Sequence, residues 1–407
     1  MQIITPHYIM LADRVVSNLS VAFDKTIQKI APFDELLDSY PDAKVTTLRE
    51  HSLLMPGLIN AHVHIEFSKN KTELSYGDFL NWLYSVIENR ADLINDCGLE
   101  CMSHAIDTML QNGITTFGAI SSQAMDLQAC AEAKQNVVFF NELIGSQAHM
   151  ADALFGDFTA RLDASKSIQR EGFYPAIAIH SPYSVHPILV KKAVEIAKSE
   201  NLKLTAHFME SIAEREWLDE SKGDFKKFFE ELLSQTQSVG DAKEFLSYFD
   251  NKETLFTHVT NANEEELQII AKNNHTIIHC PISNRLLGNP TLDIAALQER
   301  KIEWIVATDG LSSNYDLDLF EEMKISLFMH DKAPLGEFAQ ELLDAVTINA
   351  AKALGLNTGE IAEGKNADML IIDLENEPTK DLALHLILHR YNISKVYVNG
   401  KLEVGEE

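Results

Sequence analysis

The feature that most constrains the fold is a regular alternation of apolar β-type runs with amphipathic helical stretches between residues 56 and 354. Eight runs can be counted: GLINAHVHI, ITTFGAI, VVFFNELIG, YPAIAIHSP, LKLTAHFME, TLFTHVT, TIIHCPISN and IEWIVATDG. Helical stretches such as HPILVKKAVEIAKSEN lie between them. Eight β-runs, each followed by helical material over about 250 to 300 residues, predict an α/β fold of the (β/α)8 TIM-barrel type.

Both ends of the chain are rich in strand patterns. Residues 1–55 contain short alternating stretches such as RVVSNLSVAFD, and residues 355–407 contain ADMLIIDL and ISKVYVNGKLEV. The Asn399-Gly400 pair inside the last stretch is a hairpin turn signal. We therefore expect residues 1–55 and 355–407 to form one small composite β-sandwich beside a catalytic barrel of residues 56–354.

Charge and cysteine content limit the class of protein. The net charge of −27 argues against nucleic acid or an anionic membrane as a partner. No leader pattern and no long uncharged apolar run is evident, which predicts a soluble cytoplasmic protein. The cysteine content, four in all, fits a reducing compartment, and we expect Cys97 and Cys101 to be packed thiols on one helix rather than metal ligands. The oligomeric state is open, with a homodimer as one option.

Ionisable side chains gather where the expected barrel strands end, which is where barrel enzymes carry their chemistry. They are His62 and His64 in the first run, His180 in the fourth, His207 and Glu210 in the fifth, His258 in the sixth and Asp309 in the eighth. Five of the 15 histidines therefore point toward one expected mouth of the barrel.

Four of these residues form a predicted site for one divalent ion, for which zinc is the expected metal. His62 and His64 stand two apart on a strand, so both imidazoles reach the same side, and His207 and Asp309 complete the set. Each of these residues also has an ordinary structural explanation. His62 and His64 could be a chance H-x-H, His207 could be a core histidine, and Asp309 could be a turn aspartate before Gly310. His180 is a further candidate ligand. No lysine that could bridge a second ion ends a strand, which favours one metal.

Two further residues could move protons beside this ion. Glu210 lies three residues beyond His207, near enough to act as a proton shuttle, although it could also be a solvated glutamate that begins the next helix. His258 could hydrogen-bond a metal-bound water or be a satisfied interior histidine. The sequence alone leaves both alternatives open.

The stretches PGLINAHVH, TAHFMES, FTHV, HCPISN and TDGLSSN resemble the amidohydrolase superfamily, in its branch of purine deaminases and triazine chlorohydrolases. The resemblance covers essentially the whole chain. It implies that His62, His64, His207 and Asp309 hold one ion that makes hydroxide available. Asp309 would then take a proton from the attacking water. Glu210 would protonate the adjacent ring nitrogen, and His258 would stabilise the tetrahedral centre.

The resemblance also suggests an adenine nucleoside as the substrate. HSPYSV resembles a motif whose histidine contacts ribose, which would be His180, and ELSYGDFLNWL resembles a loop over the ligand, with Trp82 as a wall. The chain departs from its relatives at NELIGSQ, where Glu142 and Ser146 replace an arginine, and in SNRLLG, which carries Arg285.

Among the branch, the chain looks most similar to the deaminases that convert 6-aminodeoxyfutalosine to futalosine and ammonia in menaquinone biosynthesis. Ser146 or Arg285 could bind the carboxylated tail of that substrate. The alternatives are deamination of S-adenosylhomocysteine, methylthioadenosine or adenosine. A chlorohydrolase-type reaction is disfavoured by the presence of both Glu210 and His258. A non-catalytic scaffold is disfavoured because no metal ligand is missing.

Overall fold

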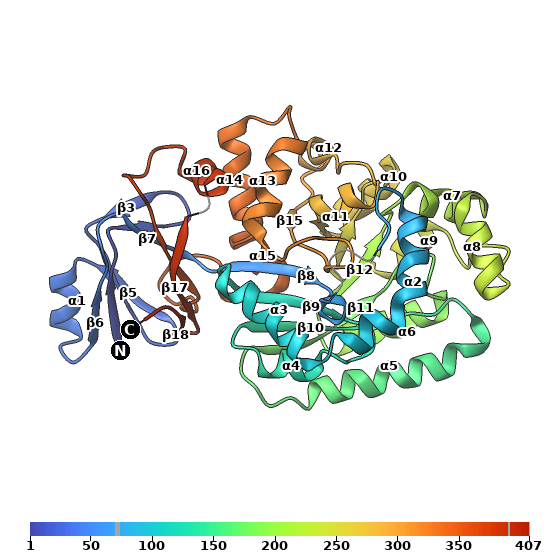
Figure 1. Cartoon of the computed structure of the whole chain (residues 1–407), viewed down its shortest axis with the longest axis horizontal. Coiled ribbons are helices and arrows are strands. Elements are labelled where there is room, and N and C mark those ends of the chain that lie inside the picture. Colours follow the sequence, from blue (N-terminus) through green and yellow to red (C-terminus); the bar gives the residue numbers. More distant parts are fainter. Residues whose placement is uncertain (70–73, 390, 407) are drawn as a thin grey trace.

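The computed structural model describes residues 1–69, 74–389 and 391–406. It has a larger part in which helices surround a sheet, and a smaller β-rich part that contains both ends of the chain (Figure 1). The first residue of the ELSYGDFLNWL stretch lies outside the described residues. Among the described residues, no helix combines the length and apolar character that a membrane crossing requires.

The larger part is a (β/α)8 barrel, as the sequence predicted. Its eight strands are parallel and follow one another in chain order around the sheet. The backbone N–H of Asp309, after the last strand, donates to the carbonyl of His62 in the first at 3.1 Å, which helps to close the barrel. The strands are β8 (Leu58–Val63), β9 (Ile114–Ser121), β10 (Asn136–Leu143), β11 (Phe173–Ile179), β12 (Leu204–Phe208), β13 (Leu255–His258), β14 (Thr276–His279) and β15 (Trp304–Val306).

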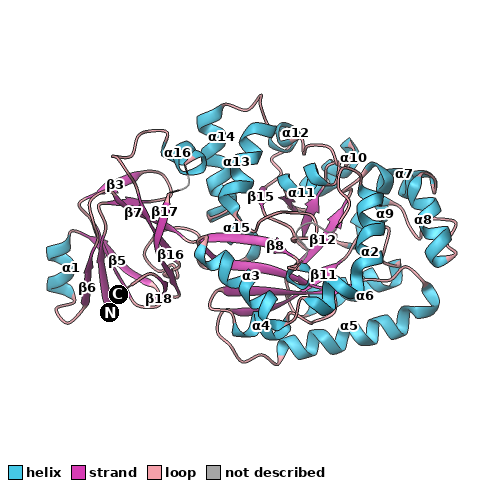
Figure 2. Ribbon diagram, in the orientation of Figure 1, coloured by secondary structure: helices cyan, strands magenta, loops and turns pink. Residues whose placement is uncertain are grey.

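Helices cover the outside of the barrel (Figure 2), so strands such as β9 and β10 are buried along their whole length. Local signals fix the helix ends; α10 (Glu264–Lys272), for example, begins with a capping box of Asn263 and Glu266. The helices from the barrel strands onward are α2 (Phe79–Asp96), α3 (Leu99–Gln111), α4 (Leu127–Glu132), α5 (Ala151–Lys166), α6 (Pro187–Ser199), α7 (Ile212–Glu220), α8 (Asp224–Leu233), α9 (Ala242–Tyr248), α10 (Glu264–Lys272), α11 (Pro281–Leu286), α12 (Ile294–Glu299), α13 (Leu319–Met329), α14 (Leu335–Ala345), α15 (Ile348–Leu354) and α16 (Leu382–Leu388).

The smaller part is the composite β-sandwich that the sequence predicted. One sheet has the order β5-β4-β1-β6, and the other, β18-β17-β16-β7-β2-β3, joins strands from both ends of the chain. Apolar side chains such as Phe23, Leu54 and Met369 form its core. The exact division at residues 55 and 355 stays a prediction. The elements are β1 (Gln2–Thr5), β2 (Tyr8–Met10), β3 (Val15–Ser17), β4 (Ser20–Phe23), β5 (Ile27–Ala31), α1 (Phe33–Ser39), β6 (Lys44–Thr47), β7 (Ser52–Pro56), β16 (Met369–Asp373), β17 (Asn392–Val398) and β18 (Lys401–Val404).

The prediction for Cys97 and Cys101 was wrong, because the two residues form a disulfide instead of packing as free thiols. They do not share one helix: α2 ends at Asp96, Gly98 caps α3, and Cys101 lies in the first turn of α3. This break brings their Cα atoms to 5.2 Å, within the range that a disulfide requires.

Candidate active site

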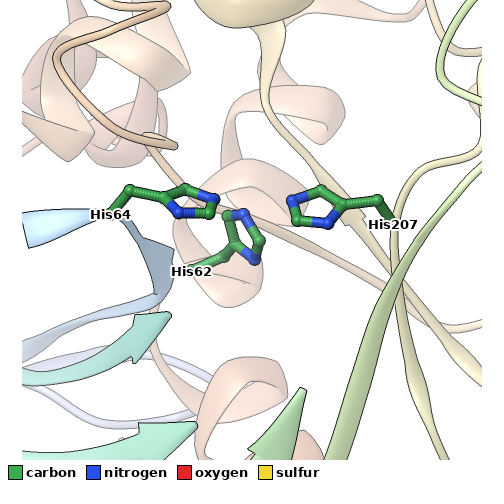
Figure 3. Close-up of side chains that lie close together, drawn as sticks. All are labelled: His62, His64 and His207. Atoms are coloured by element: carbon green, nitrogen blue, oxygen red, sulfur yellow. The ribbon is translucent and has the colours of Figure 1, made fainter. Parts of the chain in front are cut away.

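Three imidazoles converge at the mouth of the barrel (Figure 3). His62 belongs to β8, His64 follows it immediately, and His207 belongs to β12. One ring nitrogen from each lies within 4.8 Å of the other two. The strands thus bring His207 close to His62 and His64, which lie 143 or more positions earlier in the sequence, as the barrel prediction required.

Hydrogen bonds on the outer side of the His62 and His207 rings leave the inner nitrogens of these two rings available. Nδ1 of His207 lies 2.8 Å from the carbonyl oxygen of His180, and since a carbonyl only accepts, Nδ1 carries the proton. The Nε2 atom of His207 therefore presents its lone pair. Nδ1 of His62 is 3.2 Å from Thr257 Oγ1, and its buried Nε2 has no hydrogen-bond partner within the described part of the chain. An orphaned buried nitrogen of this kind suits a metal ligand.

Asp309 brings a carboxylate to the same point. Its Oδ1 lies 3.6 Å from Nε2 of His62 and 3.6 Å from Nε2 of His64. Its Oδ2 accepts hydrogen bonds from the hydroxyls of Ser283 and Ser313, both at 2.8 Å, which fix the carboxylate plane.

Asp309 is also held in a strained backbone conformation and in a charged state. Its φ of +59° is rare for a residue with a side chain and is typical of functional sites. Burial raises its pKa, but the close approach of His62 and the charge of His64 outweigh that effect, and the pKa lies well below the usual range. Its Oδ1 also accepts from the N–H of Gly310 at 2.8 Å, so the predicted turn contact exists together with the inward orientation.

These donor atoms fit zinc, which prefers imidazole nitrogen and carboxylate oxygen. A second group of side chains, Glu142, His180 and His207, also places ligand atoms within 4.8 Å of one another. In that group Nδ1 of His207, which lies 4.0 Å from Glu142 Oε1, already donates to a carbonyl, and Nδ1 of His180 lies 2.6 Å from Ser184 Oγ. The geometry therefore favours the group that contains His62 and His64.

Glu210 is buried beside this centre rather than solvated at a helix start. Its Oε1 lies 3.5 Å from Nε2 of His258. Burial, followed by the charges of Asp309 and Glu214, raises the pKa of Glu210 well above its ordinary value, which favours the protonated form of the group.

The backbone at Glu210 is held by Glu214, a residue that carries no functional signal in the sequence. The carboxyl oxygens of Glu214 accept from the N–H groups of Met209 at 3.0 Å and Glu210 at 2.7 Å. Met209 has a φ of +49°, so these bonds support a turn that is otherwise unfavourable. Burial raises the pKa of Glu214 to about 7.

His258 is fully buried and neutral at ordinary pH, because burial lowers its pKa to about 4. Its Nδ1 lies 2.9 Å from Asn284 Oδ1, an acceptor, which leaves Nε2 as an acceptor facing Glu210. Its φ of +73° is again unusual. Asn284 is thus a residue that positions His258. It belongs to the HCPISN stretch, but the sequence of that stretch gave no indication of this role.

A cavity of about 440 Å³ adjoins the centre at the end of β10. Glu142 and Ser146 belong to its lining, and Ser146 Oγ donates to Gln235 Oε1 at 3.0 Å. The remaining walls combine apolar and polar side chains. The apolar ones are Leu143, Ile144, Met150, Leu154, Phe229 and Leu233, and the polar ones are Ser122, Gln147, Asp157, Arg161 and Ser184.

The other predicted substrate contacts are placed as follows. His180 lies next to His207, with ring centroids 5.1 Å apart. Trp82 lies on α2, and its Nε1 donates to the carbonyl of Ser312 at 2.8 Å, which ties α2 to the loop after Asp309. Arg285 is exposed near the end of α11 and is not part of the cavity lining.

The chain resembles known proteins over nearly its whole length. A model described as the amidohydrolase family matches residues 53–402. The chain is 49% identical over 408 residues to an aminodeoxyfutalosine deaminase of a Nitratiruptor species, with 100% of each chain covered. It is 35% identical over 393 residues to an adenosine deaminase of Helicobacter pylori, with 95% of each chain covered. The crystal structure of Helicobacter pylori aminofutalosine deaminase with methylthio-coformycin superposes with a TM-score of 0.93 at 34% identity, covering 99% of this chain and 100% of the other.

Proposed function

Since the chain belongs to the amidohydrolase family, we propose that it is a hydrolytic deaminase that replaces the 6-amino group of an adenine nucleoside with oxygen. The proposed substrate is 6-aminodeoxyfutalosine, and the products are futalosine and ammonia, a step of menaquinone biosynthesis. The observation that carries this choice is the 49% identity, over the full length of both chains, to an aminodeoxyfutalosine deaminase.

His62, His64, His207 and Asp309 would hold a single zinc ion. A bound divalent ion of this type supplies Lewis acidity and lowers the pKa of a water molecule to about 7. The support for this assignment is the pair of inner nitrogens that outer hydrogen bonds leave available on His62 and His207, together with the inward Oδ1 of Asp309.

Asp309, Glu210 and His258 each have a separate role in the proton transfers. Asp309 accepts a proton from the attacking water at a carboxylate oxygen. Glu210, whose pKa is raised, donates its proton to the ring nitrogen next to the amino-bearing carbon and then assists the departure of ammonia. Neutral His258 accepts a hydrogen bond at Nε2 and so orients the attacking oxygen.

The substrate contacts are assigned by position. His180 would contact the ribose, and Trp82 would form a wall on the side of α2. The carboxylated tail would bind to Ser146 or Arg285. Steady-state assays of Ser146→Ala and Arg285→Ala test the tail contacts, and an unchanged KM in both variants would remove these residues from that role.

The function is tested by following the ultraviolet change from adenine to hypoxanthine with four purified nucleosides: 6-aminodeoxyfutalosine, methylthioadenosine, S-adenosylhomocysteine and adenosine. We expect the highest kcat/KM with 6-aminodeoxyfutalosine and at least about 100-fold loss in Glu210→Gln. A matched control, Glu216→Gln on the following helix α7, should retain activity. No turnover of any of the four would contradict the proposal.

Adenosine or methylthioadenosine deamination is a second candidate. It is favoured by the 35% identity to a protein named adenosine deaminase and by the similarity to a structure that contains methylthio-coformycin. A higher kcat/KM with either of these nucleosides than with 6-aminodeoxyfutalosine would establish it. A homodimer and a cytoplasmic location stay predictions.

A further inference from the structure

Glu142 presents a buried acceptor that nothing in the described protein satisfies. It lies at the end of β10 and is only 1% exposed. Its Oε2 accepts a hydrogen bond from Ser122 Oγ at 2.5 Å, whereas its buried Oε1 has no hydrogen-bond partner among the described residues. A buried carboxyl oxygen without a donor is costly, because it has lost its hydrogen bonds to water and gained none from the protein. Since Glu142 lines the cavity, a bound ligand can supply the missing donor.

The carboxyl group of Glu142 is held in place from two directions. Glu66, itself buried, accepts the N–H of Ser122 at 3.0 Å and those of Gln123 and Met125 at the same distance, which fixes the loop that carries the Ser122 hydroxyl. Arg161 donates to the backbone carbonyl of Glu142 at 2.9 Å. The acceptor is therefore preorganised, since ordering it on binding requires little additional loss of freedom.

The position of Glu142 indicates which part of a nucleoside it meets. Its Oε1 is 4.0 Å from Nδ1 of His207, the ring atom that points away from the proposed ion. If the amino-bearing carbon of the base lies at the ion, Glu142 lies farther along the bound nucleoside. The nucleoside atoms that it meets are then those between the base and the tail. In a nucleoside these atoms belong to the sugar, whose hydroxyls are hydrogen-bond donors.

We propose that Glu142 recognises the sugar of the substrate through a hydrogen bond that its Oε1 accepts from a ribose hydroxyl. The site then accepts adenine ribonucleosides and rejects those that lack the hydroxyl. This inference rests on the proposed function and adds the sugar specificity to it. Binding a hydroxyl through a buried polar group discriminates strongly, since the analogue without the hydroxyl leaves the acceptor unpaired.

The experiment compares kcat/KM for adenosine, 2′-deoxyadenosine and 3′-deoxyadenosine in the zinc-loaded wild type, Glu142→Gln and Ser122→Ala. We expect the wild type to favour adenosine over one of the two deoxynucleosides by at least about 100-fold. This ratio should fall about tenfold or more in Glu142→Gln and by a smaller factor in Ser122→Ala. A ratio within one preparation does not depend on the folded fraction. Asp152→Asn, which removes an exposed carboxylate of α5, should leave the ratio unchanged.

The outcomes separate the inference from the proposed function. Equal kcat/KM for all three nucleosides in the wild type would overturn the sugar contact while the deaminase assignment stands. An unchanged ratio in Glu142→Gln would also overturn it. Binding of a second equivalent of zinc that is lost in Glu142→Gln would show that Glu142, His180 and His207 form a metal site instead. Absence of turnover with every adenine nucleoside would contradict the proposed function and this inference together.

Discussion

Replacing Asn284 by aspartate should move the acid limb of the pH–rate profile. In the wild type, Oδ1 of Asn284 lies 2.9 Å from Nδ1 of His258. The Nδ2 atom of Asn284 has no hydrogen-bond partner in the described part of the chain, so Asn284→Asp removes no visible hydrogen bond. It adds a negative charge beside the imidazole, and this charge favours the protonated form of His258.

The size of the effect follows from the pKa of His258, which burial lowers to about 4. At pH 6 about 99% of the imidazole is then neutral. A neighbouring carboxylate raises such a pKa by about 1 to 3 units, which leaves between about 90% and about 10% of His258 neutral at pH 6. Only the neutral ring can accept a hydrogen bond at Nε2 from the attacking water.

The assay is kcat/KM for deamination between pH 5 and 9 in the wild type and in Asn284→Asp, both zinc-loaded. The variant should lose activity progressively below about pH 7 and recover toward the wild-type value above pH 8. Asn263→Asp is the matched control, because Asn263 is the exposed N-cap of α10, where aspartate caps equally well and its charge does not contact His258. Parallel profiles for the wild type and Asn284→Asp would refute the role of Asn284 in setting the state of His258.

Three further predictions follow from the same geometry. His62→Ala should lose the bound zinc, measured by plasma emission analysis, and with it nearly all activity; full zinc occupancy would contradict the ligand assignment. Glu214→Gln should lower kcat about tenfold with little change in KM, because glutamine keeps a single acceptor oxygen and cannot accept from the N–H groups of both Met209 and Glu210; a tenfold rise in KM with unchanged kcat would contradict this role. Cys97→Ser should lower stability by about 2 kcal/mol in chemical denaturation, an effect that reductant should reproduce in the wild type; equal midpoints in all samples would exclude a stabilising disulfide with Cys101.

The barrel could be predicted because each of its strands corresponds to a continuous apolar run in the sequence, as buried parallel strands require. The run TIIHCPISN extended too far, since Pro281 begins α11 and β14 ends at His279. Proline at the first position of a helix gives a local signal for this end, but the apolar character of the run obscured it.

The convergence of His62, His64, His207 and Asp309 could also be predicted, because strand ends of a barrel meet at one mouth. The residues that position them could not. Thr257 supports His62 from 195 residues away, and Asn284 supports His258 from 26 residues away. No sequence period links such pairs, because the contact depends on side-chain orientation in the folded barrel. The disulfide was missed for a similar reason, since the break between α2 and α3 at Gly98 is needed to bring the two sulfurs together.

The most direct test of the central claim is anomalous diffraction at the zinc edge from crystals of the zinc-loaded protein. The claim is that His62, His64, His207 and Asp309 bind one ion at the mouth of the barrel. It predicts a single strong peak at about 2.0–2.2 Å from Nε2 of the histidines and from an oxygen of Asp309. A peak between Glu142 and His180 instead, or no peak near His62, would contradict it.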